Sequence, residues 1–68
     1  MVNTNKLRGI IAERGYTQAQ IAKKIGIAPK TFYEKMDRKV FLSNEIESMV
    51  EILNIHDIQS IFFDRKVT

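Results

Sequence analysis

The apolar residues of this 68-residue chain recur every three or four positions, which is the spacing of one face of an α-helix. The first such stretch covers residues 4–14, in which Leu7 and Ile11 lie one turn apart. Gly15 follows, at the place where a residue of positive φ commonly ends a helix. Strict alternation of apolar and polar residues, the pattern of a half-buried strand, does not occur before the last few residues. The pattern predicts an all-α chain.

Two short helices with a tight turn between them are expected next. Thr17 and Gln20 have the capping-box spacing, in which each side chain accepts a hydrogen bond from the other residue's backbone amide. Gly26 ends the second helix, and Pro29 begins the third because proline is favoured at a first helical position. Two short helices joined by a glycine turn and preceded by a separate amphipathic helix have the layout of a helix-turn-helix unit, here at about residues 17–36.

The third helix is expected from about Pro29 to Met36. At about 100° per residue, Phe32 and Met36 point to the core, and Lys30 and Glu34 point nearly opposite. A helix with this orientation fits the major groove of DNA, where lysine donates to guanine and glutamate accepts from cytosine. The alternative is an exposed ion pair between Lys30 and Glu34, which are four residues apart.

The rest of the chain predicts two more helices and so a compact five-helix bundle. Ser43 is expected to cap the fourth helix, with Glu45 and Glu47 near its positive end, and Asn54 is expected to end it. The apolar stripe of this helix is Ile46, Met49, Val50 and Leu53. The inner face of the short fifth helix is Ile58, Ile61 and Phe62.

The composition of the chain argues against several classes of protein and of site. At 44% hydrophobic and 28% charged, the chain is too apolar for disorder, and no apolar run approaches the roughly 20 residues of a membrane span. It has no cysteine and a single histidine, His56, so we expect no disulfide, metal, cofactor or small-molecule ligand. The start of the chain lacks a secretory signal. We therefore expect one domain, residues 1–68, inside the cell.

The charge is divided unevenly along the chain. Residues 1–40 carry nine basic and three acidic side chains, a balance of +6, whereas residues 41–68 carry two basic and five acidic ones, a balance of −3. One half would attract a polyanion such as nucleic acid, and the other would be repelled by it. A solvated surface with a chance imbalance is equally compatible with these counts.

A family resemblance supports nucleic acid as the partner. Residues 17–27, TQAQIAKKIGI, resemble the T-Q-x-x-[LI]-A-x-x-[LI]-G-[IV] signature of the lambda-repressor-like DNA-binding family (XRE, Cro/repressor type). The similarity covers about residues 5–62, and the Tyr-x-Lys-Met end of the third helix with the later Ile-Phe-Phe resembles small regulators of phages and prophages. The resemblance implies a sequence-specific, usually dimeric transcriptional regulator that binds double-stranded DNA in the bacterial cytoplasm.

The resemblance also implies roles for single residues. The positions that face base edges in the family are Pro29, Lys30 and Glu34, and those near the DNA backbone include Gln18, Thr31 and Tyr33. Pro29 replaces a polar reader, so its base contact is restricted to an apolar one, such as a thymine methyl. Lys35 stands where many members bury an aliphatic side chain, so we expect different packing at the end of the third helix.

Basic side chains near the third helix are further candidates for phosphate contacts. Lys35, Arg38 and Lys39 follow the base-facing positions, and each phosphate neutralised steepens the salt dependence of binding by about 0.9 log units per decade. Lys6 and Arg8, on the first helix, are weaker candidates. The alternative for each of them is a solvated surface charge.

Several apolar residues near the end of the chain lie off the predicted core stripes. With Ile55 and Val67, the residues Ile52, Ile61 and Phe63 are expected to form an exposed patch within about residues 52–68. Such a patch indicates an interface, and a two-fold dimer would place two third helices about 34 Å apart on DNA. The alternative is that these residues complete a small core.

Two other classes of function compete with DNA binding. In a protein-interaction module of the same fold, the C-terminal patch would hold a partner such as an anti-repressor or a toxin. An enzyme is disfavoured. Ser43 or Ser60 with His56 and Asp57 would supply the residue types of a hydrolytic triad, but nothing in the sequence supplies an oxyanion hole. Salt-sensitive binding to DNA separates the regulator from the partner module.

Overall fold

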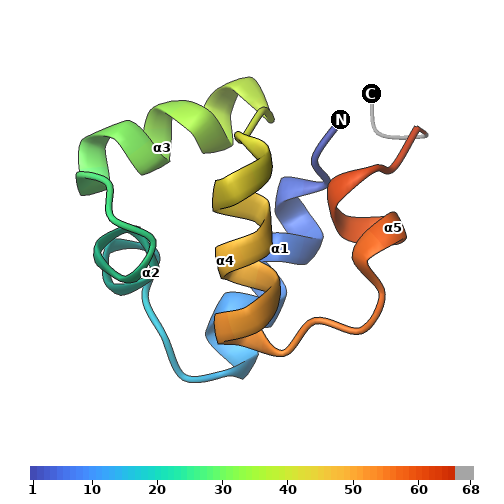
Figure 1. Ribbon diagram of the computed structural model, residues 1–68, viewed down its shortest axis with the longest axis horizontal. Coiled ribbons are helices and arrows are strands. Elements are labelled where there is room, and N and C mark those ends of the chain that lie inside the picture. The colour runs from blue at the N-terminus through green and yellow to red at the C-terminus, as the bar shows by residue number, and fades with distance from the viewer. Residues whose placement is uncertain (66–68) are drawn as a thin grey trace.

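The computed structural model describes residues 1–65 as five α-helices (Figure 1). They are α1 (Thr4–Glu13), α2 (Gln18–Lys24), α3 (Pro29–Arg38), α4 (Ser43–Leu53) and α5 (Ile58–Phe62). No strand occurs in the described residues, so the all-α prediction is confirmed. The structure measures 28 × 22 × 20 Å along its principal axes.

The five helices share one hydrophobic core. In the view of Figure 1, α1 and α4 lie in the middle, α2 and α3 lie on one side of them, and α5 lies on the other. Each helix contributes a fully or nearly fully buried side chain, among them Leu7, Ile21, Phe32, Met49 and Phe62. Burial of such a side chain stabilises the fold by about 1.5–3 kcal/mol. Because each helix is apolar on one face only, none of them is stable without the others.

Side-chain caps begin the first two helices. Asn3 caps α1, and its Oδ1 accepts a hydrogen bond from the backbone N–H of Lys6 at 3.2 Å. The capping box predicted at α2 is confirmed. The N–H of Gln20 donates to Oγ1 of Thr17 at 3.1 Å, and the N–H of Thr17 donates to Oε1 of Gln20 at 2.8 Å.

The third helix is longer than predicted. It ends at Arg38 rather than at about Met36. The chain then turns at Lys39, which has a left-handed conformation with φ of 60°. Glycine or asparagine usually takes this position, so a lysine there gave no stop signal in the sequence.

The predicted cap of α4 by Ser43 is wrong. Ser43 is the first residue of the helix, and Leu42 occupies the cap position. A leucine side chain has no hydrogen-bond acceptor, so only half of a capping box forms here. The Oε1 atom of Glu45 accepts the backbone N–H of Leu42 at 2.8 Å. Glu45 is buried in consequence, with 4% of its surface exposed.

The predictions for the C-terminal apolar residues are partly wrong. Ile61 and Phe62 are buried as expected for α5, but Ile58, at the first position of this five-residue helix, is exposed. Ile55 and Ile61 were expected in an exposed patch, and both are core residues. Ile52 is half-buried and packs against the core. Val67 lies outside the described residues.

The first residues of the chain connect α3 to α5. The N–H of Val2 donates to the carbonyl of Lys39 at 3.1 Å, and the N–H of Asn3 donates to the carbonyl of Ile61 at 2.6 Å. The Val2 side chain is buried in the core. The end of α3 is thereby held at a fixed distance from α5. Of the helices in residues 1–65, none has the length and apolar character that crossing a bilayer requires.

Two glycines of opposite conformation give a paired test of the helix assignments. Gly26 has φ of +86° and Gly9 lies inside α1, and a Cβ atom at either position would meet nothing within 4 Å. We expect Gly26→Ala to destabilise the fold by about 1–2 kcal/mol through left-handed strain alone. Gly9→Ala should stabilise it by about 0.5–1 kcal/mol. Urea unfolding of both variants measures the difference, and effects of the same sign would contradict the assignment.

The cap of α5 predicts a dependence of stability on pH. Oδ1 of Asp57 accepts the N–H of Ser60 at 3.2 Å. Hydrogen bonds from the side chain and then the backbone of Ser60 hold the pKa of Asp57 below its usual value. A carboxyl group with a lowered pKa stabilises the fold above its unfolded-state pKa, and this stabilisation is lost as the pH falls through the folded-state value. Asp57→Ala should therefore lower the Tm at about pH 6 and change it less at about pH 2. An equal change at both would exclude a role for the charge.

Candidate nucleic-acid interface

The orientation of α3 decides which of its side chains face solvent. Phe32 is fully buried and Met36 is 5% exposed, so the inward face is the predicted one. The ring of Phe32 packs against that of Phe41, which precedes α4, with the centroids 5.4 Å apart. Lys30 and Glu34 are exposed as a result.

The exposed face of α3 carries charges of both signs. No ion pair joins Lys30 to Glu34 in the part of the chain that the structure describes, so the alternative of an i, i+4 pair receives no support. Asp37, one turn beyond Glu34, is also exposed, and the sequence reasoning did not single it out. Pro29, at the first position of the helix, is half-buried. A helix surface of this kind offers both donors and acceptors for hydrogen bonds.

A polar concavity of about 340 Å³ lies beside this face. It collects residues from α1, α2 and α3 and from the turn after α3, namely Thr4, Arg8, Gln18, Tyr33, Met36, Asp37 and Lys39. Three of the residues predicted to lie near a DNA backbone, Gln18, Tyr33 and Lys39, are therefore neighbours in space. Arg8 joins them because it lies one turn after Thr4 on α1, a proximity that no local sequence motif could reveal.

The other residues predicted to contact the DNA backbone differ in their surroundings. Thr31 is half-buried on the flank of α3, and Arg38 is exposed at its last turn. Lys35 is engaged inside the protein, with its Nζ 2.6 Å from Oε2 of Glu45. A phosphate could attract this ammonium group only by leaving a buried carboxylate without its partner, which is costly. Lys35 is therefore a poor candidate for a phosphate contact.

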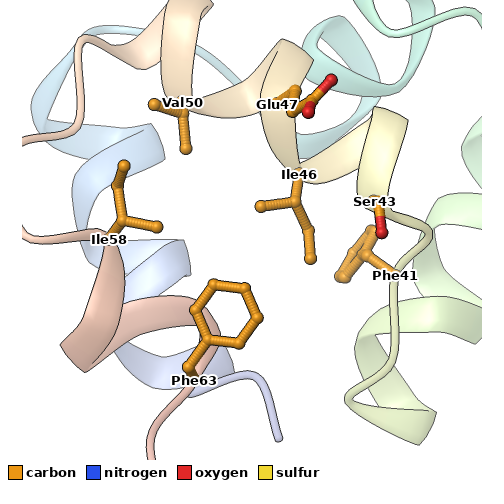
Figure 2. Close-up of a pocket in the computed structure, with 7 residues that line it drawn as sticks. All are labelled: Phe41, Ser43, Ile46, Glu47, Val50, Ile58 and Phe63. Atoms are coloured by element: carbon orange, nitrogen blue, oxygen red, sulfur yellow. The ribbon is translucent and has the colours of Figure 1, made fainter.

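An apolar groove of about 520 Å³ lies between α4 and α5 (Figure 2). Ile46 and Val50 of α4 form one wall, and Ile58 and Phe63 form the opposite one. The ring of Phe63 points into the groove and is 50% exposed. Phe41, Ser43 and Glu47 complete the lining.

The groove is part of a larger apolar surface. An adjoining hollow shares Phe41, Ile46 and Phe63 with it and adds Met1 and Val40. We define the apolar face as Met1, Val40, Phe41, Ile46, Val50, Ile58 and Phe63. Four of these are among the six large hydrophobic residues that the described structure exposes most, so exposed apolar surface is concentrated here. Of the predicted interface residues Ile52, Ile61 and Phe63, only Phe63 belongs to it.

The described residues offer little to other kinds of site. Within residues 1–65, no three His, Asp or Glu side chains come together as metal ligands. His56 is exposed between α4 and α5, and the carboxylate of Asp57 accepts a hydrogen bond in the cap of α5.

Comparisons with known proteins add no relative. No protein-family model matches the chain, and no match was found among curated proteins or solved structures.

Proposed function

We propose that this protein is a sequence-specific regulator of transcription of the Cro/repressor type, in which α2 and α3 act as a helix-turn-helix unit on double-stranded DNA. The observation that carries the proposal is the orientation of α3. Burial of Phe32 and Met36 leaves Lys30 and Glu34 on a solvent-exposed face of a ten-residue helix, within the basic half of the chain. The major groove is wide enough to receive such a helix.

In this proposal α3 reads bases with side chains of complementary chemistry. Lys30 donates to O6 and N7 of guanine, and Glu34 accepts from N4 of cytosine. Pro29, at the start of the helix, contributes an apolar contact such as one with a thymine methyl. Each of these contacts is made by a helix whose backbone is fixed by the core, so the side chains are presented in a constant register.

The concavity beside α3 would follow the DNA backbone. Arg8 and Lys39 supply positive charge there, and Gln18 and Tyr33 supply hydrogen-bond donors. Thr31 and Arg38 extend the same surface along α3. Asp37 repels phosphate and limits how closely the DNA backbone can approach, which favours one register over others. The balance of +6 in residues 1–40 would steer the protein to DNA with this side first.

The apolar face would pair with a second copy of the chain on DNA. Within the two hollows that make up this face, the charged side chains are one acidic and one basic residue, Glu47 and Lys39, so the lining has no excess of one sign. Val40 directly follows the turn that ends α3. A two-fold dimer that binds DNA in this way must have its two α3 helices on the same side, as successive major grooves require.

A second candidate function uses the apolar face without DNA. The groove between α4 and α5, with a volume of about 520 Å³, would receive apolar side chains of a different protein, and the module would then bind a partner through it. The two candidates differ in what Lys30 does, because Lys30 lies outside the apolar face.

The base-reading role of Lys30 is tested by DNA affinity. An operator is first selected by the wild-type protein from a pool of random duplexes, and fluorescence anisotropy then compares it with random DNA over a salt series. Lys30→Ala should weaken operator binding by about 1–3 kcal/mol. Lys23→Ala, which removes the same charge from the exposed side of α2, is the matched control and should change operator binding much less.

One result would contradict the base-reading role of Lys30, and another would contradict DNA binding itself. Equal losses of operator affinity for Lys30→Ala and Lys23→Ala would show that Lys30 acts only as a positive charge and does not read a base. Binding of the wild type that is absent, or that does not depend on salt, would exclude a DNA regulator and favour the partner module.

The apolar face is tested by the oligomeric state. Phe63→Asp introduces a charge into the groove, and we expect it to abolish the dimer that the wild type forms on operator DNA. His56→Asp introduces an acidic residue at an exposed position outside the face and should leave the dimer intact. Light scattering of the proteins alone and with operator gives the masses. A wild-type complex with one protein copy per operator would contradict dimerisation.

A further inference from the structure

An ion pair between Lys35 and Glu45 connects α3 to α4. The Nζ atom of Lys35 lies 2.6 Å from Oε2 and 2.8 Å from Oε1 of Glu45. Oε1 also accepts the backbone N–H of Leu42 at 2.8 Å. The carboxylate of Glu45, in the first turn of α4, thus binds both Lys35 in the last turn of α3 and Leu42 in the connection between the two helices.

Of the two residues in the pair, the acid is the more deeply buried one. Glu45 is 4% exposed, whereas 23% of the Lys35 side chain is exposed. Burial of two charges costs desolvation energy that offsets much of their attraction, so such a pair contributes little net stability. Its contribution is positional, because Nζ must stay within hydrogen-bond reach of a carboxylate that also accepts the Leu42 amide. The apolar contacts of Phe32 and Met36 are non-directional.

Lys35 lies where it can control the rotation of α3 about its own axis. It follows Phe32 by three residues and is about 60° away from it around the helix, between the buried face and the exposed one. A small rotation that Phe32 and Met36 would tolerate breaks the contact between Nζ and the carboxylate. The same rotation moves the ends of Lys30 and Glu34 across the exposed face.

We propose that the Lys35–Glu45 pair positions α3 for base reading, and that Lys35 does not itself contact phosphate. This inference rests on the proposed DNA-binding function. Hydrogen bonds to base edges need accurate placement of the side chains, whereas attraction to phosphates does not. Loss of the pair therefore lowers the preference for the operator over random DNA and leaves the affinity for random DNA largely intact.

Two variants with the same charge change test the proposal. Glu45→Gln keeps an oxygen for the Leu42 amide and removes the charge that holds Lys35. Glu51→Gln removes a charge from an exposed position of the same helix, outside the apolar face. Both should bind random DNA slightly more tightly than the wild type, because each removes one negative charge. Only Glu45→Gln should lose operator preference, by about tenfold.

A second readout concerns the free protein. Residual dipolar couplings of the backbone amides in α3 report the orientation of this helix relative to α4. They should change in Glu45→Gln and remain at wild-type values in Glu51→Gln. If Glu45→Gln does not fold, the double variant Lys35→Met/Glu45→Gln leaves no unpaired charge and retains the bond to the Leu42 amide, and it should show the same loss of preference.

The outcomes distinguish this inference from the proposed function. Equal operator preference and equal couplings in Glu45→Gln and Glu51→Gln would overturn the positioning role. A salt dependence of operator binding that is shallower by about 0.9 in the double variant than in the wild type would show that Lys35 contacts phosphate, which also overturns it. If the wild type binds no DNA, the proposed function fails. The couplings then still decide whether the pair fixes α3.

Discussion

Burial of Phe32 and Met36 is the constraint on which the rest of the molecule depends. These two side chains attach α3 to the core, and the ring of Phe32 packs against the tilted ring of Phe41 from the segment that precedes α4. In a chain this small, the core has no room to accept a different face of α3, because nearly every buried position is already filled at high density. The exposed face, with Lys30 and Glu34, is therefore a consequence of packing.

Apolar and polar interactions both hold α3 in place. The apolar contacts determine how deeply the helix lies in the core, and the ion pair between Lys35 and Glu45 restrains its rotation. At the far end of the helix, the backbone bond from Val2 to the carbonyl of Lys39 links α3 to the segment that also pairs with α5. A helix restrained in depth, rotation and end position suits recognition by hydrogen bonds, where errors of placement are costly.

The structure places the two proposed interaction surfaces over different helices. Positive charge and polar groups gather around α1, α2 and α3, while exposed apolar side chains gather over α4, α5 and the turn after α3. The proposed DNA contact and the proposed contact with a second copy therefore use different faces and do not compete. Lys39 and Val40 are adjacent in the chain and lie at the boundary, where one surface ends and the other begins.

The helices, the capping box at Thr17 and the inward turn of Phe32 and Met36 were determined by the sequence, because helical periodicity and end signals are local properties. The end of α3 and the start of α4 were not, because they depend on a left-handed lysine and on a carboxylate that accepts the backbone N–H of Leu42. Tertiary structure alone decided that Arg8 lies beside Gln18, that Lys35 is bound to Glu45, and that Ile58 is exposed while Ile61 is buried. Each of these depends on how separate helices meet, and no spacing along one helix contains that information.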